Sequence, residues 1–220
     1  MLLVRLGALL LIAAACQPPR IVPNALAVSR QAIVVVADQP NATTGKLQRY
    51  ERDSLQAPWR AAGDAVPVVF GRKGLAPAGQ KREGDGRSPS GIFPLGTVFG
   101  FAQSIDLRMP YRQLRETTEC VDDSASFYYN QIVDRDMVPV DWSSSEKMRE
   151  IGQYHWGVVV EYNTPPKPQR GSCIFLHIWS GPNSTTAGCT AMRQEDLQTI
   201  LLWLDPRANP LLVQGVEAGF

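Results

Sequence analysis

The sequence predicts a single, mainly β domain, a β-sandwich or barrel with short helices and elaborated loops. Three observations favour this fold class. The apolar runs are short and rich in β-branched residues, turn formers are plentiful, with 18 Gly and 17 Pro, and only short stretches have helical spacing. A length of 220 residues is ordinary for one domain.

The expected strands follow one another along the chain. Ala32–Ala37 is a β-branched run that predicts a buried strand, and Lys46–Asp53 has the weak alternation of a partner strand. Further strands are expected at Val66–Phe70, Ile92–Phe101, Tyr154–Tyr162, Cys173–Trp179 and Leu211–Val213. Polar, glycine-rich or proline-rich loops at 79–91 and 163–171 separate several of them.

Two helices are expected between these strands. Ser143 and Glu146 have the spacing of a capping box, which predicts a short helix that ends near Ile151. Glu195–Leu204 places apolar residues at helical spacing, and the Asp205-Pro206 pair stops that helix.

The first 30 residues are expected to be an export signal and a tether. Arg5 precedes an apolar run of ten residues, which is shorter than the roughly 20 needed to span a bilayer. Residues 1–15 therefore predict a signal peptide. Because three alanines precede Cys16, the segment resembles a bacterial lipoprotein signal, so we expect lipidation of Cys16. Ordinary cleavage nearby and an uncut anchor are the alternatives.

Residues 16–30 would then be a lipid-anchored tether, and residues 31–220 the folded domain. The expected location is exported, periplasmic and membrane-tethered. Contact with the membrane would depend on the acyl chains alone, because the exported chain has almost no net charge.

Four cysteines in an exported chain allow one disulfide and one deliberate free thiol. With Cys16 lipidated, Cys120, Cys173 and Cys189 remain. Cys189 follows a glycine and lies among small residues, which lets a substrate approach its sulfur closely. We therefore expect a Cys120–Cys173 disulfide and a free Cys189, although the sequence leaves the other pairings open.

Charge and motifs disfavour several functional classes. The chain has 22 basic and 21 acidic residues, whereas a nucleic-acid partner would favour a basic excess. It lacks the clustered Cys/His spacings of zinc sites, the G-x-S-x-G nucleophile motif and the phosphate-binding loop. We therefore expect no metal, no cofactor and no nucleic acid.

The remaining chemistry centres on Cys189 and His177. A cysteine nucleophile needs a base, which is usually histidine, and the chain has only two. His177 shares one face of its strand with Phe175 and Trp179, and an eleven-residue loop can bring Cys189 back to it. The alternative for His177 is a structural core residue. His155 has no such partner and is expected to be structural or to face substrate.

Two motifs resemble the YkuD-type L,D-transpeptidases. His177 followed by Thr186-Ala187-Gly188-Cys189 is similar to that family's His-Gly, spacer, Ser/Thr-His-Gly-Cys signature. The segment 88–93, Ser-Pro-Ser-Gly-Ile-Phe, is similar to the family's Thr-Pro-x-Gly-x-Phe segment. Ile178 replaces the glycine after the histidine, Ala187 replaces the second histidine, and the spacer is shorter.

The resemblance implies an L,D-transpeptidase catalytic domain that acts on peptidoglycan stem peptides. The Cys189 thiolate would attack a stem carbonyl, with His177 as its base, and an amine on a neighbouring stem would capture the thioester. A backbone carbonyl would orient His177, and the N–H groups of Gly188 and Cys189 would form an oxyanion hole. Carbapenem-type β-lactams are the expected acylating inhibitors.

Several side chains are candidates for substrate binding. The charges of the 82–87 loop would grip a zwitterionic stem peptide, and two tryptophans would hold water away from the thioester. The candidates are Arg82, Glu83, Asp85, Arg87, Trp156, Trp179 and Thr186. A solvated turn and core aromatics are the alternatives. The alternative functions are an L,D-carboxypeptidase, endopeptidase or amidase, in which water is the acceptor, and a non-catalytic wall-binding lipoprotein.

Overall fold

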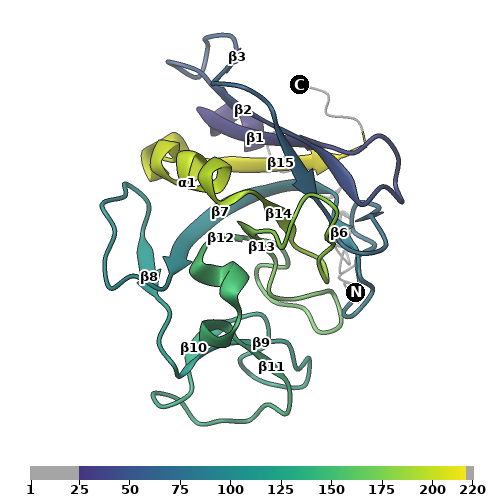
Figure 1. Ribbon diagram of the computed structural model, residues 1–220, viewed down its shortest axis with the longest axis vertical. Coiled ribbons are helices and arrows are strands. Elements are labelled where there is room, and N and C mark those ends of the chain that lie inside the picture. The colour runs from purple at the N-terminus through teal and green to yellow at the C-terminus, as the bar shows by residue number, and fades with distance from the viewer. Residues whose placement is uncertain (1–24, 217–220) are drawn as a thin grey trace, which may run out of the picture.

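A closed eight-stranded mixed β-barrel dominates the structure, a computed structural model that describes residues 25–216 (Figure 1). In ring order the strands are β1 (Gln31–Val36), β15 (Leu211–Gly215), β7 (Gly91–Gly100), β12 (Trp156–Val160), β13 (Phe175–Ile178), β14 (Thr190–Met192), β4 (Val66–Val69) and β2 (Thr44–Glu51). Antiparallel pairing of β1 with β2 closes the ring. The fold class expected from the sequence is therefore correct, and the barrel is the form it takes.

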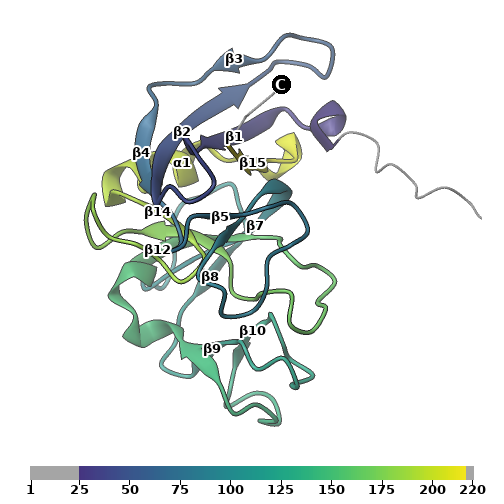
Figure 2. The ribbon, with the colours of Figure 1, turned by 90° about the vertical axis from the view of Figure 1, so that its right-hand side faces the viewer.

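Short elements decorate the barrel. A three-stranded sheet lies at one end, opposite the end that carries β3, in both ribbon views (Figures 1 and 2). The additional strands are β3 (Arg60–Ala61), β5 (Leu75–Ala76), β6 (Ser88–Pro89), β8 (Tyr111–Gln113), β9 (Thr118–Val121), β10 (Ile132–Asp134) and β11 (Ser145–Lys147). The helices are α1 (Gln194–Trp203) and the 3-10 turns η1 (Ala25–Val28), η2 (Met148–Glu150), η3 (Gly152–His155) and η4 (Pro206–Ala208).

Helix α1 completes the hydrophobic core. Its apolar stripe places Leu197, Ile200 and Leu201 in one buried cluster with Ile33 of β1 and Leu176 of β13. Each of these side chains is at most 2% exposed. Full burial of an aliphatic side chain contributes about 1.5–3 kcal/mol, so the helix helps to hold β13, the strand that carries His177.

The helix expected at residues 143–151 is absent, and that prediction is wrong. Ser145–Lys147 forms strand β11, which pairs with β9, and two short 3-10 turns follow. The Ser143 hydroxyl and backbone N–H both bind the Asp123 carboxylate instead of capping a helix. Glu146 turns inward and accepts a hydrogen bond from Tyr154, so neither half of the capping box forms.

Most of the expected strands are present, with shifted ends. The strands expected to begin at Tyr154 and Cys173 begin two residues later, at Trp156 and Phe175. Tyr154 lies in η3, and Cys173 has a φ of +54°, outside strand geometry. Strand β14 was missed because three residues are too short for a periodic signal.

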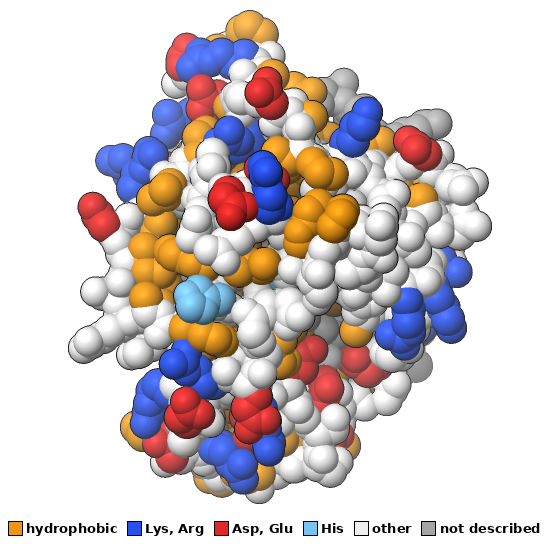
Figure 3. Space-filling model, viewed as in Figure 1, with side chains coloured by type: hydrophobic (Ala, Val, Ile, Leu, Met, Phe, Trp, Pro, Cys, Tyr) orange, Lys and Arg blue, Asp and Glu red, His pale blue; other side chains and the backbone are white. Residues whose placement is uncertain are grey.

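The surface of the small sheet carries charges of both signs. Figure 3 shows Lys and Arg side chains interspersed with Asp and Glu at that end of the molecule. Arg115, for example, contacts Asp136 at 2.7 Å and Asp134 at 3.5 Å. Within residues 25–216, no helix has the length and apolar character needed to cross a membrane.

Candidate active site

Two adjacent parallel strands bring His177 and Cys189 to one cavity. In the β13–β14 register His177 pairs with Ala191, and Cys189 precedes Ala191 by two residues. Residues two apart on an extended chain point to the same face. The backbone N–H of Phe175, two residues before His177, donates a 3.3 Å hydrogen bond to the Cys189 sulfur. The two candidate residues therefore occupy neighbouring positions on one face, and both line the same cavity.

Cys189 is a free thiol, whereas Cys120 and Cys173 form the expected disulfide. The thiol contacts the carbonyl oxygen of Cys173 at 3.3 Å. The disulfide thus connects strand β9 to the residue whose carbonyl holds the free thiol.

His177 has the tautomer of a general base. Its Nδ1 lies 2.7 Å from the carbonyl oxygen of Ile178, so Nδ1 carries the proton and Nε2 is left as the acceptor. The Tyr154 ring packs edge-on against the imidazole, with 5.3 Å between centroids. Burial lowers the pKa of His177 to about 4, with the hydrogen bond to Ile178 opposing the shift. The Ile178 carbonyl fills the orienting role that the family resemblance implies.

At rest the pair is neutral rather than a thiolate and an imidazolium. Burial raises the pKa of the Cys189 thiol to about 12, and the negative charge of Glu146 raises it further. The Phe175 N–H and the positive charge of Lys81 oppose this shift. The resting thiol therefore carries its proton, which agrees with the expectation that a base is needed to remove it.

Cys189 lies between two cavities. The histidine-side cavity, about 190 Å³, is lined by His177, Tyr154, Trp179, Thr186, Glu146 and Cys189 among others. The lysine-side cavity, about 170 Å³, is lined by Arg72, Lys81, Glu83, Asp122, Glu146 and Cys189 among others. Cys189 is only 6% exposed and borders both cavities.

One hydroxyl from a distant segment and one from the preceding loop fix the backbone of Cys189. Ser88 and Thr186 each donate a 2.7 Å hydrogen bond to the carbonyl oxygen of Cys189. The Gly188 N–H donates to the Thr186 hydroxyl at 3.1 Å, so that donor is engaged at rest. A Cβ on Gly188 would lie 3.1 Å from both the Lys81 ammonium nitrogen and the Arg87 carbonyl oxygen. Glycine at this position permits the close approach of the lysine.

Three of the seven predicted substrate-binding residues line these cavities: Glu83, Trp179 and Thr186. The other four lie elsewhere. Asp85 accepts hydrogen bonds from Lys81 and from two backbone N–H groups, and Arg87 donates to the Leu75 carbonyl, so both hold the loop together. Arg82 is exposed and donates to the Lys81 carbonyl. Trp156 packs against the barrel core.

Several cavity residues were not predicted from the sequence. Lys81 is only 4% exposed, and its ammonium group contacts Asp85 at 2.9 Å and the Arg87 carbonyl at 2.8 Å. Arg72 and Asp122 also line the lysine-side cavity, and one oxygen of Asp122 is buried with no hydrogen-bond partner. Lys81 directly precedes the charged loop 82–87 that was selected from the sequence. No local sequence pattern marks Arg72 or Asp122 as site residues.

Glu146 and Tyr154 are the other residues that were missed. Glu146 lines both cavities, and its Oε2 accepts a 2.6 Å hydrogen bond from the Tyr154 hydroxyl. Burial raises the pKa of Glu146 to about 7, and the charges of Asp122 and Glu83 add to the shift, while the Tyr154 hydrogen bond opposes it. The capping-box interpretation concealed this residue, because it assigned the carboxylate to a helix terminus.

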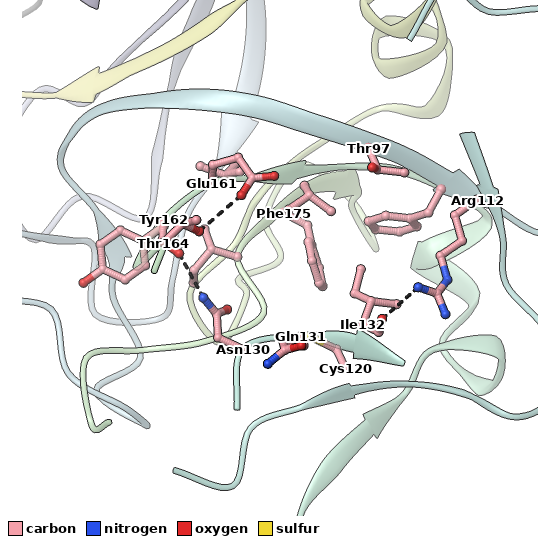
Figure 4. Close-up of a pocket in the computed structure, with 14 residues that line it drawn as sticks. Thr97, Arg112, Cys120, Asn130, Gln131, Ile132, Glu161, Tyr162, Thr164 and Phe175 are labelled. Atoms are coloured by element: carbon pink, nitrogen blue, oxygen red, sulfur yellow. Dashed lines mark hydrogen bonds between the residues drawn. The ribbon is translucent and has the colours of Figure 1, made fainter. Parts of the chain in front are cut away.

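A separate cavity of about 260 Å³ lies between the barrel and the small sheet (Figure 4). Arg112 and Ile132 lie at one side of it, and Glu161 and Asn130 at the other. Neither His177 nor Cys189 is among the residues that line it. It therefore lies apart from the two candidate catalytic residues. Within residues 25–216, no group of three or more His, Cys, Asp and Glu residues is arranged to hold a metal ion.

Comparison with known proteins shows which family the chain matches. Residues 31–213 match the YkuD family, described as the L,D-transpeptidase catalytic domain. Among solved structures, the chain resembles the helical cell shape determining protein Pgp2 from Campylobacter jejuni, at 13% identity and a TM-score of 0.42. That match covers 88% of this chain and 52% of the other, so this chain spans about half the length of that structure. A search of curated proteins found no match. Because the family match covers most of its length, the chain belongs to the YkuD family of L,D-transpeptidase catalytic domains, whose function is of the peptidoglycan L,D-transpeptidase type.

Proposed function

We propose that this protein is a peptidoglycan L,D-transpeptidase that forms stem-peptide cross-links through a thioester on Cys189, with His177 as the base. One observation carries the proposal. The Ile178 carbonyl holds the Nδ1 proton of His177, which leaves Nε2 as an acceptor on the strand face that carries a free thiol. A nucleophile, a base and a group that orients the base are the elements of covalent acyl transfer.

The first half-reaction forms the acyl-enzyme. The Cys189 sulfur attacks a stem-peptide carbonyl as its proton moves to Nε2 of His177. The Ile178 carbonyl stabilises the imidazolium through Nδ1–H. As the tetrahedral intermediate collapses, the C–N bond breaks and His177 returns the proton to the leaving amine. The products are a thioester and a free amine, and His177 is neutral again.

Backbone donors beside the sulfur would stabilise the oxyanion. The Cys189 N–H is the first candidate, because the Gly188 N–H is bonded to Thr186 at rest. Ser88 and Thr186 hold the Cys189 carbonyl, which lies in the peptide unit that follows this N–H, so they restrain the residue that carries the donor. Loss of one oxyanion donor typically costs about 3–4 kcal/mol in the transition state.

The lysine-side cavity suits a zwitterionic stem peptide. Arg72 and Lys81 offer positive charge to carboxylates, and Glu83 and Asp122 offer negative charge to an ammonium group. The buried, unpartnered oxygen of Asp122 supports the latter role, because a ligand N–H would satisfy it. On the other side of the sulfur, Trp179 gives the histidine-side cavity an aromatic wall that would help to exclude water.

The decisive experiment is digestion of purified muropeptides by the protein and its Cys189→Ala variant, with product masses as the readout. The transpeptidase proposal expects D-alanine release and cross-linked products from the parent protein and neither from the variant. Products retained by the Cys189→Ala variant would exclude the dyad. Cleavage that is unaffected by an added amine acceptor would indicate a carboxypeptidase, endopeptidase or amidase. Absence of both turnover and carbapenem acylation would indicate a non-catalytic wall-binding lipoprotein.

The export signal and the lipid anchor on Cys16 remain proposals, because residues 1–24 lie outside the described residues. A periplasmic, membrane-tethered protein would reach the peptidoglycan that the family modifies. Membrane fractionation of a Cys16→Ser variant tests the anchor: the variant is expected in the soluble fraction, and unchanged membrane association would exclude lipidation.

A further inference from the structure

The fold places Glu146 beside the nucleophile through a short chain of contacts. Glu146 is the central residue of β11 and pairs with Cys120 of β9. Cys120 is disulfide-bonded to Cys173, whose carbonyl oxygen contacts the Cys189 thiol at 3.3 Å. The Glu146 side chain lines both cavities that flank Cys189. A carboxyl group from a separate sheet therefore borders the same two cavities as Cys189, and its charge acts on the thiol.

The carboxyl group has one occupied and one open oxygen. Oε2 accepts the hydrogen bond from Tyr154, a residue of η3 whose ring also packs against His177. Within residues 25–216, Oε1 has no hydrogen-bond partner and no cation is paired with the carboxylate. The charged groups around it are Asp122 and Glu83, and Arg72 and Lys81 line the lysine-side cavity with it. Lys81 is itself bound by Asp85 and the Arg87 carbonyl.

The second half-reaction needs a proton acceptor besides His177. An acceptor amine arrives as an ammonium group with three protons and ends as an amide nitrogen with one. Of the two protons it loses, one is needed to restore the Cys189 thiol when the C–S bond breaks. The other must go to a different group. His177 can carry only one of them at a time, and its burial makes a long-lived imidazolium unfavourable.

We propose that Glu146 is a catalytic base of this second half-reaction, an inference that rests on the transpeptidase function proposed above. Its Oε1 accepts the first proton of the incoming ammonium group, so a neutral amine attacks the thioester carbonyl. The C–N bond forms, and the second nitrogen proton passes through His177 to the sulfur as the C–S bond breaks. Glu146 then releases its proton to water, which restores the site and balances the reaction.

The properties of the site suit this role. A pKa of about 7 for Glu146 lets the carboxylate both accept and release a proton near neutral pH. The two neighbouring carboxylates, Asp122 and Glu83, draw an ammonium group into the lysine-side cavity. Glu146 also belongs to the histidine-side cavity, so it meets the acceptor next to the sulfur.

The test separates the two half-reactions in the Glu146→Gln variant. Glutamine is isosteric and can still accept the Tyr154 hydrogen bond, but it cannot take a proton. Rapid-quench mass spectrometry with a tetrapeptide muropeptide donor and an amine acceptor follows the acyl-enzyme. We expect acylation to be unchanged or faster, deacylation to be slower by about 10²-fold, and acyl-enzyme to accumulate. Glu150→Gln, an exposed carboxylate four residues away, is the matched control and should behave as the parent protein.

A pH series distinguishes catalysis from positioning. In the parent protein, deacylation should slow as the pH falls below about 7, the pKa of Glu146, and Glu146→Gln should lack this dependence. Glu146→Asp, which keeps a carboxylate, should recover part of the rate. Equal deacylation in Glu146→Gln, or equal slowing of both half-reactions, would overturn the proposal. A parent protein that is never acylated would instead overturn the transpeptidase function itself.

Discussion

The hydroxyl of Ser88 donates a 2.7 Å hydrogen bond to the carbonyl oxygen of Cys189, 101 residues later in the chain. The same hydroxyl accepts the backbone N–H of Gly71 at 3.0 Å. Ser88 thus ties the segment before the barrel strand β7 to the peptide of the nucleophile. The two motifs that suggested the family are parts of one hydrogen-bonded unit.

Ser88→Ala should therefore lower both the free energy of unfolding and the rate of acylation. The substitution leaves the Gly71 N–H without its partner and removes one of two hydroxyls from the Cys189 carbonyl. A buried polar group left unsatisfied costs about 1–3 kcal/mol, and we expect that loss in urea-unfolding free energy together with slower acylation. Ser90→Ala, two residues away and less buried, is the control. Equal stability of the two variants would contradict this role.

The Cys189 thiol should react slowly with alkylating reagents in the folded protein. With a pKa of about 12, almost none of it is thiolate at pH 8. In a Cys16→Ser background, iodoacetamide should modify the native protein at least about 10²-fold more slowly than the urea-unfolded protein. Glu146→Gln removes a negative charge that raises this pKa, so it should accelerate the native reaction. A native thiol as reactive as the unfolded one would show that a thiolate is present at rest.

Removal of the disulfide should destabilise the protein and disturb the site. The bond links residues 53 apart, and closing a loop of that length is worth about 4 kcal/mol in the chain-entropy account. The Cys120→Ala/Cys173→Ala double variant should lose a free energy of unfolding of that order. Its acylation should also slow, because β9 and β11 lose their covalent link to the residue that holds the Cys189 thiol. A loss below about 1 kcal/mol would contradict the stabilising role.

Two buried groups should give opposite dependences of stability on pH. The pKa of His177 is lowered from 6.5 to about 4, so its contribution to stability is present above pH 6.5 and is lost as the pH falls towards 4. The pKa of Glu146 is raised from 4.5 to about 7, so its contribution is present below pH 4.5 and is lost as the pH rises towards 7. A shift of this size corresponds to at most about 3.4 kcal/mol for each group.

Variants separate these two contributions. Relative to the parent protein, His177→Asn should lose less stability between pH 6.5 and 4, and Glu146→Gln should lose less between pH 4.5 and 7. Chemical denaturation at half-unit pH intervals gives the free energy of unfolding of each protein. The difference between variant and parent protein is then plotted against pH. If this difference stays constant between pH 6.5 and 4 for His177→Asn, or between pH 4.5 and 7 for Glu146→Gln, the pKa of that residue is not shifted in the folded protein.

Local sequence patterns predicted much of the fold. The β-branched run that forms β1, the amphipathic spacing of α1 and the turn formers between strands each act through nearest neighbours and periodicity. The capping box failed because its two residues found better partners at a distance: Ser143 bound Asp123, and Glu146 met Tyr154. A local sequence pattern does not show that distant partners compete with the capping interactions.

For the site, the sequence by itself narrowed the candidate base to two histidines and favoured Cys189 as the free thiol, because residue counts and small neighbours limit those choices. The disulfide pairing stayed open until the structure placed Cys120 against Cys173. Only the tertiary structure decided the protonation state of the pair, since burial and the Ile178 carbonyl set it. It also decided that Asp85 and Arg87 hold their own loop together while Glu146 lines the cavities beside Cys189. Desolvation and the approach of distant charges depend on how the barrel closes, and no segment of the chain contains that information alone.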